Sequence, residues 1–225
     1  MADQPKPLNL VETMELMDSS QLDQLTQQLE ERVKKKSADM RSLLMLGLGY
    51  YLRGQMKSAI QIFERAISVN PNLPYAYYYL GIAYYRMVNL DMAITMLRKV
   101  INLTPKIIMA HYWLGITYWH KGDNEQALAA FEQLLQHNAE SPIAHYHAAL
   151  ACLAEQYYEK ALFHLEALRE TNTIDSRMFL HLGNVYFRLN RVQDAITAYR
   201  QGLILSPNNT QIKEALAYLV EVPEP

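Results

Sequence analysis

The 225-residue sequence lacks the features that mark several common classes of protein. Its one cysteine, Cys152, excludes an intramolecular disulfide and a cysteine-rich metal site. No stretch approaches the roughly 20 apolar residues that a membrane-spanning helix needs, and residues 1–7 lack the apolar core of a signal peptide. We therefore expect a soluble, cytoplasmic protein, and a peripheral position on a membrane-bound partner is compatible with the sequence.

The net charge is also small, and motifs typical of enzymes are missing. The formal net charge is −2, so the chain has no general electrostatic attraction to nucleic acid or to anionic lipid. There is no glycine-rich phosphate loop, no zinc-binding spacing and no nucleophile elbow. The seven histidines are not joined by carboxylates or thiolates at ligand spacing, which favours structural roles. The sequence thus predicts no enzyme, no cofactor and no metal site.

What the sequence does contain is an internal repeat with a period of 34 residues. Such a period is typical of stacked arrays of small units, which serve as binding surfaces and whose single units carry no chemistry. The invariant alanines are Ala59, Ala93, Ala127, Ala161 and Ala195. A leucine–glycine pair recurs at 46–47, 80–81, 114–115 and 182–183, a tyrosine at 50, 84, 118 and 186, and a proline at 71, 105 and 207.

Each unit is predicted to form two helices. The units begin at Met40, Pro74, Ile108, Pro142 and Ser176, and positions are numbered below as slots from these residues. Helix A covers about the first 14 slots and helix B most of the rest. Because a helix turns 100° per residue, slots 4, 7, 8 and 11 form one arc, which we expect to pack against helix B. Glycine inside a helix costs about 1 kcal/mol relative to alanine, so its recurrence at slot 8 indicates a close approach of the two helices.

This pattern resembles the tetratricopeptide repeat, in which a bulky residue, Leu-Gly, Tyr, Ala, a second bulky residue and Pro stand at these offsets. The resemblance covers residues 40–207 and implies an all-α fold, a right-handed superhelix of helix-turn-helix repeats (an α-solenoid). It also implies that the A helices line a concave groove. The predicted organisation is a tail and a capping helix from a degenerate half-repeat (1–39), repeats at 40–73, 74–107, 108–141, 142–175 and 176–207, and a C-terminal capping helix and tail (208–225).

Unit four and the two ends depart from the pattern. Unit four has Ala148, Ala149 and Cys152 at seam slots, which predicts looser packing unless Tyr157 and Tyr158 fill the space. At the N-terminal end, Ser20 and Asp23 resemble a capping box at the start of a degenerate helix B. Residues 8–17 have one apolar helical face. Three roles are compatible with it: capping the array, entering its own groove, or entering the groove of a second copy, which would make a homo-oligomer.

A second face of helix A, formed by slots 2, 5, 9, 12 and 13, is apolar and aromatic in the middle units. Two interpretations fit: neighbouring A helices cover it, or it lines an open groove for a partner, because large apolar patches mark binding sites. We favour the groove. The predicted groove residues are Leu48, Tyr51, Tyr75, Tyr78, Ile82, Tyr85, Arg86, Met109, Tyr112, Ile116, Trp119, Tyr146, Leu150, Arg177, Asn184, Phe187 and Arg188.

The predicted function is therefore binding of another protein, as a scaffold, adaptor or assembly factor. The expected ligand is an apolar or amphipathic peptide or helix. The lysine–asparagine–arginine clamp that some related repeats use for free carboxylates is missing, since Leu44 and Leu48 hold its opening slots. Two alternatives stay open: a chaperone that shields an apolar client segment, and a module that self-associates through residues 8–17. No nucleic-acid partner and no insertion into a membrane are expected.

Overall fold

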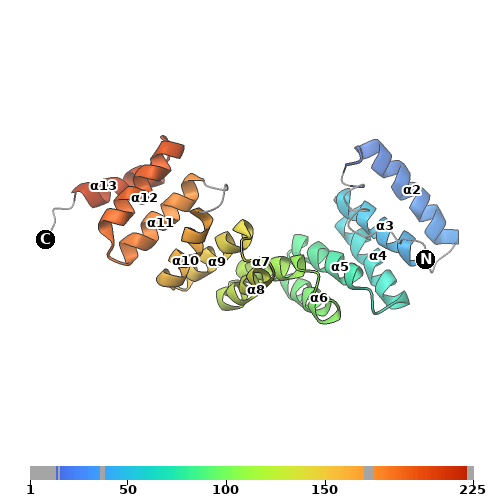
Figure 1. The fold of residues 1–225 in the computed structure, drawn as a ribbon. Coiled ribbons are helices and arrows are strands. Elements are labelled where there is room, and N and C mark those ends of the chain that lie inside the picture. The colour runs from blue at the N-terminus through green and yellow to red at the C-terminus, as the bar shows by residue number, and fades with distance from the viewer. Residues whose placement is uncertain (1–13, 15, 36–38, 170–174, 222–225) are drawn as a thin grey trace. The chain divides into compact units, whose positions relative to one another are not determined.

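The 34-residue period produces alternating helices along the chain (Figure 1). The computed structural model describes residues 14, 16–35, 39–169 and 175–221, and every regular element among them is an α-helix. The first helices of the repeats are α3 (Met40–Leu52), α5 (Pro74–Arg86), α7 (Met109–Lys121), α9 (Pro142–Ala154) and α11 (Ser176–Arg188). The second helices are α4 (Met56–Val69), α6 (Leu90–Leu103), α8 (Asn124–His137), α10 (Tyr158–Arg169) and α12 (Val192–Leu205). The array begins with α2 (Ser19–Lys35) and ends with α13 (Thr210–Glu221).

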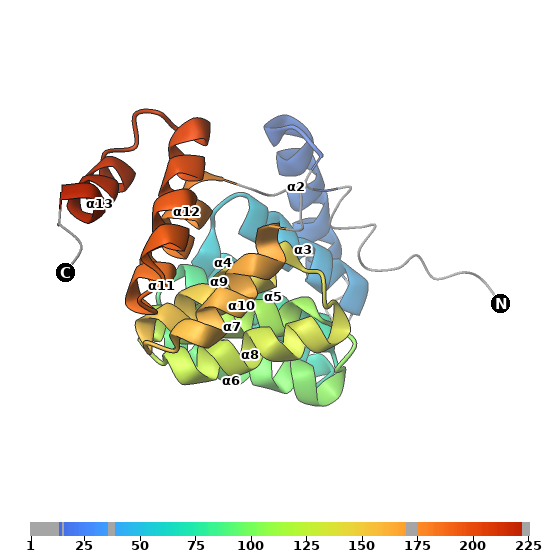
Figure 2. The same ribbon diagram turned by 60° about the vertical axis from the view of Figure 1, so that its left-hand side comes forward.

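The chain divides into two compact units, Met1–Thr117 and Tyr118–Pro225, called unit 1 and unit 2 below. The 34-residue units of the sequence are called repeats from here on. The boundary falls inside α7. Within unit 1, α3 packs on α4 and α5 on α6; within unit 2, α9 packs on α10. The pair α11 and α12 lies side by side in both views (Figures 1 and 2). These pairs are the helix A and helix B predicted from the repeat.

The seam between the two helices of a repeat explains the recurrent glycine and alanine. All five alanines at slot 20 are 0% exposed. A Cβ atom added at Gly81 would lie only 2.8 Å from Cγ of Leu97, at slot 24 of the facing helix. At Gly183 it would overlap the ring of Tyr199. The slot-8 glycine is therefore required by the bulky residue at slot 24, as the sequence predicts.

The turn between helix A and helix B is the same in every repeat. The residue at slot 15 has a positive φ, between 59° and 84°. The next N–H then bonds to the carbonyl five residues back, as from Arg191 to Tyr186 (2.8 Å), which is the hydrogen-bond pattern of a helix C-cap. The slot-15 residues are Gly54, Val88, Gly122, Gln156 and Asn190. Val88 is the unfavourable member, because a β-branched side chain is strained at positive φ.

A second recurrent contact joins α3, α5 and α11 to the helix before each of them. The hydroxyl of Tyr50 donates to Glu30 (2.7 Å) and that of Tyr84 to Glu64 (2.6 Å). Tyr186 donates to Glu166 in the same way. Burial and the partner carboxylate raise the pKa of Tyr50 and of Tyr84 to about 12, so these phenols keep their protons. The slot-11 tyrosine thus links successive repeats by a hydrogen bond as well as by packing.

The N-terminal end differs from the expected capping box. Asp18, not Ser20, caps α2: Gln21 N–H donates to its carboxylate (2.9 Å) and the Asp18 N–H donates to the Gln21 side chain (3.1 Å). Asp23 instead forms an ion pair with Arg53 (2.7 Å). Residues 8–13 and 15 of the predicted apolar segment lie outside the described residues. Met14, however, is 2% exposed and packs in a cluster with Leu22 and Leu48.

Repeat four has a buried pair of histidines between its two helices. Tyr157 does not fill this seam, since its side chain is exposed and its hydroxyl donates to Glu125 (3.2 Å). The buried rings of His145 and His164 instead face each other with their Nδ1 atoms 3.0 Å apart. His145 Nε2 lies 2.9 Å from the carbonyl oxygen of Ala139. A carbonyl only accepts, so Nε2 of His145 carries hydrogen, and Nδ1 of His164 donates to Nδ1 of His145.

Candidate functional site

The first helices of unit 1 carry a group of partly accessible tyrosines. Tyr51, Tyr75, Tyr78, Tyr85 and Tyr112 are all partly buried, so each keeps part of its ring accessible. Trp113 joins this group, with its ring 5.5 Å from the rings of both Tyr85 and Tyr112.

Two further contacts shape this tyrosine surface. Burial raises the pKa of Tyr78 to about 12, against a smaller opposing effect of a hydrogen bond with Trp113. Its hydroxyl is therefore protonated near neutral pH. The guanidinium of Arg86 lies 4.9 Å from the centre of the Tyr51 ring, in cation–π geometry. The surface thus offers aromatic faces, phenol groups and one cation.

Three predicted groove residues belong to the core instead. Leu48, Ile82 and Ile116 are 5%, 4% and 6% exposed. All three occupy slot 9, and Leu48, the slot-9 side chain of the first repeat, packs in a cluster with Met14 and Leu22. A side chain that is already covered cannot anchor a ligand without rearrangement. Slot 9 becomes accessible only later in the array, at the half-buried Leu150 and the exposed Asn184.

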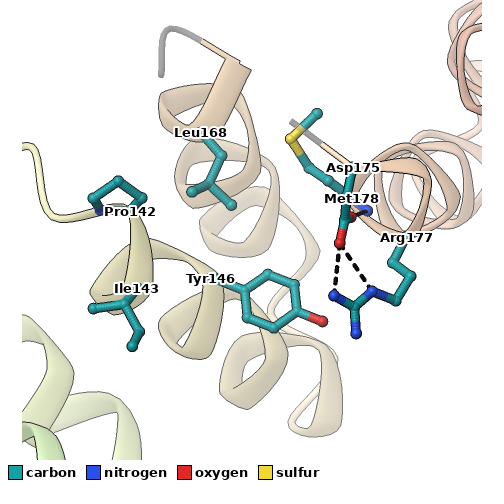
Figure 3. A pocket seen from close by; sticks show the side chains of 7 residues that line it. All are labelled: Pro142, Ile143, Tyr146, Leu168, Asp175, Arg177 and Met178. Carbon is teal, nitrogen blue, oxygen red and sulfur yellow. Dashed lines mark hydrogen bonds and ion pairs between the residues drawn. The ribbon is translucent and has the colours of Figure 1, made fainter. Parts of the chain in front are cut away.

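Unit 2 contains a hollow of about 380 Å³ between α9, the end of α10 and the start of α11 (Figure 3). Its walls are mostly apolar, and the ring of Tyr146 projects across it toward Arg177 (Figure 3). Ile143, on the same helix as Tyr146, is 44% exposed. The lining residues are Pro142, Ile143, Tyr146, Leu168, Asp175, Arg177 and Met178. We call this the α9–α11 hollow.

An ion pair closes one side of this hollow. Asp175 is the N-cap of α11 and accepts from the N–H of Met178 (2.9 Å). Arg177 donates to the same carboxylate from Nε (2.9 Å) and Nη2 (2.7 Å). Burial would raise the pKa of Asp175, but the Met178 N–H and Arg177 outweigh it and lower the pKa. The carboxylate is therefore ionised and holds the arginine at the rim.

A second hollow of unit 2, about 510 Å³, lies at the other end of α11, and we call it the Arg188 hollow. It joins α9 and α10 to α11 and the terminal helix α13. The ring of Phe187 packs edge-on against Tyr218, with ring centres 6.0 Å apart. Asn184 accepts from the hydroxyl of Tyr199 (2.7 Å). The lining residues are Leu153, Tyr158, Asn184, Phe187, Arg188 and Tyr218.

Unit 2 also contains a row of ring contacts between its first helices. His147 lies between Trp119 and Tyr146, with ring centres 6.2 and 5.5 Å away. Tyr146 in turn contacts His181, at 6.3 Å. Burial lowers the pKa of both histidines, with a further contribution from His120 at His147. These imidazoles are therefore neutral at physiological pH and extend the aromatic surface.

The sequence-based list thus falls into separate groups. Tyr146 and Arg177 meet in the α9–α11 hollow, and Asn184, Phe187 and Arg188 meet in the Arg188 hollow. Met109 is 45% exposed but lines neither. The sequence analysis missed the contributions of helix B and of the repeat junctions. The lining residues absent from the sequence-based list are Pro142, Ile143, Leu153, Tyr158, Leu168, Asp175, Met178 and Tyr218.

Profiles of known repeats match much of the chain. Those described as tetratricopeptide repeats match residues 75–106, 108–141 and 178–209, and one described as TPR repeat matches residues 47–88. Together they span more than half of the sequence. The chain belongs to the tetratricopeptide repeat superfamily.

Solved tetratricopeptide proteins share this fold. YrrB, described as a TPR protein with an unusual peptide-binding site, is 16% identical (TM-score 0.75; 83% of this chain, 96% of YrrB). MamA of Desulfovibrio magneticus RS-1 is 21% identical, with a TM-score of 0.69, and the match covers 76% of this chain and 98% of MamA. PilF of Pseudomonas aeruginosa is 16% identical, with a TM-score of 0.70, and the match covers 93% of this chain and 98% of PilF. A search of curated proteins found no match. These likenesses establish an all-α solenoid of helix pairs.

Reactive groups of this tetratricopeptide protein are few. Burial raises the pKa of Cys152 to about 11, so its sulfur is a thiol rather than a nucleophilic thiolate. In the described ranges, no three His, Cys, Asp or Glu side chains gather as a metal site would require. No helix among those residues is long and apolar enough to cross a bilayer.

Proposed function

We propose that this tetratricopeptide protein is a non-enzymatic scaffold, adaptor or assembly factor that binds an apolar or amphipathic peptide segment of another protein. The observation that carries the proposal is the α9–α11 hollow, whose apolar walls and Tyr146 ring suit one bulky side chain. A rigid aromatic anchor in a small pocket is the usual energetic centre of such contacts. The peptide-binding site named for YrrB, which shares the fold, is consistent with this use.

The tyrosines of unit 1 fit the same function. Their half-buried rings offer apolar area, and their hydroxyls can donate to a peptide backbone. Tyrosine has few rotatable bonds, so little conformational freedom is lost when a ligand covers it. The neutral imidazoles of His147 and His181 add surface of the same kind in unit 2. We therefore assign peptide contact to the tyrosines and not to the buried slot-9 residues.

The test uses a phage-displayed library of random peptides of about a dozen residues, selected on the immobilised full chain. We expect enrichment of peptides with a bulky apolar residue. Tyr146→Ser and Ile143→Ser should each weaken the selected peptides roughly tenfold or more in calorimetric titration. Phe163→Ser is the matched control, because Phe163 is 65% exposed and lies on α10, outside the α9–α11 hollow. Equal binding by Tyr146→Ser, Ile143→Ser and the control would reject this site.

Self-association through residues 8–17 is the other candidate. The burial of Met14 against Leu22 and Leu48 shows that part of this segment packs on α2 and α3 of its own chain. The suitable variant therefore lacks only residues 1–13, because a larger deletion would remove a core residue. Light scattering should give the same mass for this variant and the full chain if self-association is not the function.

A further inference from the structure

Acidic residues are missing from one of the two kinds of helix in this chain. The first helices of the five repeats, α3, α5, α7, α9 and α11, contain no aspartate or glutamate. They carry five basic residues, although the whole chain has a net charge of −2. These are Arg41, Arg86, Lys121, Arg177 and Arg188. The second helices carry both signs in equal number, with acids such as Glu64, Glu132 and Asp194 offset by lysines and arginines. The helices that form the candidate binding surfaces are thus the positive part of a slightly negative protein.

The Arg188 hollow concentrates this positive charge among hydrogen-bond donors. Asn184 uses its side-chain oxygen to accept from Tyr199, so its amide NH₂ group is the end left for a ligand. The phenol groups of Tyr158 and Tyr218 also line the hollow, and none of its lining residues in the described part of the chain is a carboxylate. Arg188 is exposed and forms no ion pair within the described part of the chain. The hydroxyl of Tyr158 already donates to Gln156 (3.5 Å). A guanidinium, an amide and the phenol of Tyr218 around one space suit an anionic oxygen ligand.

The two hollows of unit 2 therefore differ in chemistry. In the α9–α11 hollow, Asp175 already neutralises Arg177, and the walls are apolar. In the Arg188 hollow, the arginine charge is not compensated and the walls are polar and aromatic. Arg177 and Arg188 are eleven positions apart on α11, which corresponds to roughly 16 Å along the helix. An extended peptide spans that length with about five residues.

We infer that the partner segment is acidic: its bulky apolar residue enters the α9–α11 hollow, and an aspartate or glutamate about five residues away binds Arg188, Asn184 and the phenol of Tyr218. The inference rests on the proposed function, because it specifies the peptide that unit 2 recognises. Single-stranded RNA also combines rings with negative charge. We favour the peptide because the apolar walls of the α9–α11 hollow fit an aliphatic or aromatic side chain, whereas RNA binding relies on a broad basic surface.

The experiment compares the peptide libraries selected by the wild-type chain, by Arg188→Gln and by Arg188→Glu. Arg200→Gln on α12 is the matched control, since Arg200 is an exposed arginine of a second helix. We expect the wild type to enrich an acidic residue at constant spacing from a bulky apolar one. Arg188→Gln should weaken these peptides roughly tenfold or more, the range expected for a charge-assisted hydrogen bond. Arg188→Glu should enrich lysine or arginine at the acidic position.

Three results would overturn the inference, and they can be told apart. Selected peptides that need Tyr146 but contain no fixed acid, or that ignore Arg188→Gln, would leave the proposed function intact and remove the acidic contact. Failure to enrich any peptide over an uncoated support would remove both. A fluorescent oligouridylate that binds more tightly than every selected peptide, and loses affinity in Arg188→Gln, would reassign the surface to RNA. Circular dichroism of each variant verifies that it is folded.

Discussion

Acid should destabilise this protein through one buried histidine of the fourth repeat. His164 is 5% exposed, and its Nδ1–H donates to His145. Burial, followed by the nearby His145 and Lys160, lowers the pKa of His164 from 6.5 to about 4. Glu132 and Glu159 line the same outer surface as His164, but they do not reverse the shift. The folded chain therefore resists protonation at a site that the unfolded chain protonates readily.

The size and direction of the effect follow from this difference in pKa. Between pH 6.5 and about 4 the unfolded state binds more protons, so stability is fully present above pH 6.5 and is lost as the pH falls. The full loss would be about 3 kcal/mol, at 1.36 kcal/mol for each unit of pKa. By the same relation, about 2 kcal/mol is lost between roughly pH 7.5 and pH 5.

The assay is urea denaturation followed by circular dichroism at a series of pH values, for the wild type and His164→Asn. Asparagine can donate from Nδ2 to His145 but does not titrate, so this variant should lose about 2 kcal/mol less than the wild type over that interval. The carboxylates titrate in both chains and cancel in the comparison. His137→Asn, which removes an exposed histidine of α8, should behave as the wild type. Parallel pH profiles for the wild type and His164→Asn would refute the assignment.

Two further perturbations test the repeat architecture. Gly183→Ala drives a Cβ into the Tyr199 ring, which is held by a hydrogen bond. We expect a net loss of about 1–2 kcal/mol in urea denaturation, since overpacking costs more than the gain in helix propensity. An unchanged midpoint would mean that the ring moves freely. Val88→Gly should instead add about 1 kcal/mol to the free energy of unfolding, because it removes a β-branched residue from a φ of 60°. The thermal midpoint should therefore rise. A lower midpoint would show that Val88 is not strained.

The recurrence of short motifs allowed the fold to be predicted from the sequence alone. The bounds of α5 (Pro74–Arg86) and α11 (Ser176–Arg188) agree with a helix A of about 14 residues. The packing role of Gly81 was also predictable, because a helix tolerates a costly glycine repeatedly only where another helix needs the space. These are local properties, fixed by helical geometry and by the identity of residues within one 34-residue unit.

Which side chains remain accessible was decided only by the tertiary structure. Slots 5, 9 and 12 belong to the same helical face in the sequence, yet Leu48 and Ile82 are buried and Tyr146 is only half-buried. Accessibility depends on how neighbouring helices approach, and a repeat pattern does not specify that. The α9–α11 hollow, for example, needs Leu168 from a second helix and Asp175 from a repeat junction. The sequence by itself therefore determined the helices and their pairing, whereas the packing between repeats determined which side chains remain accessible.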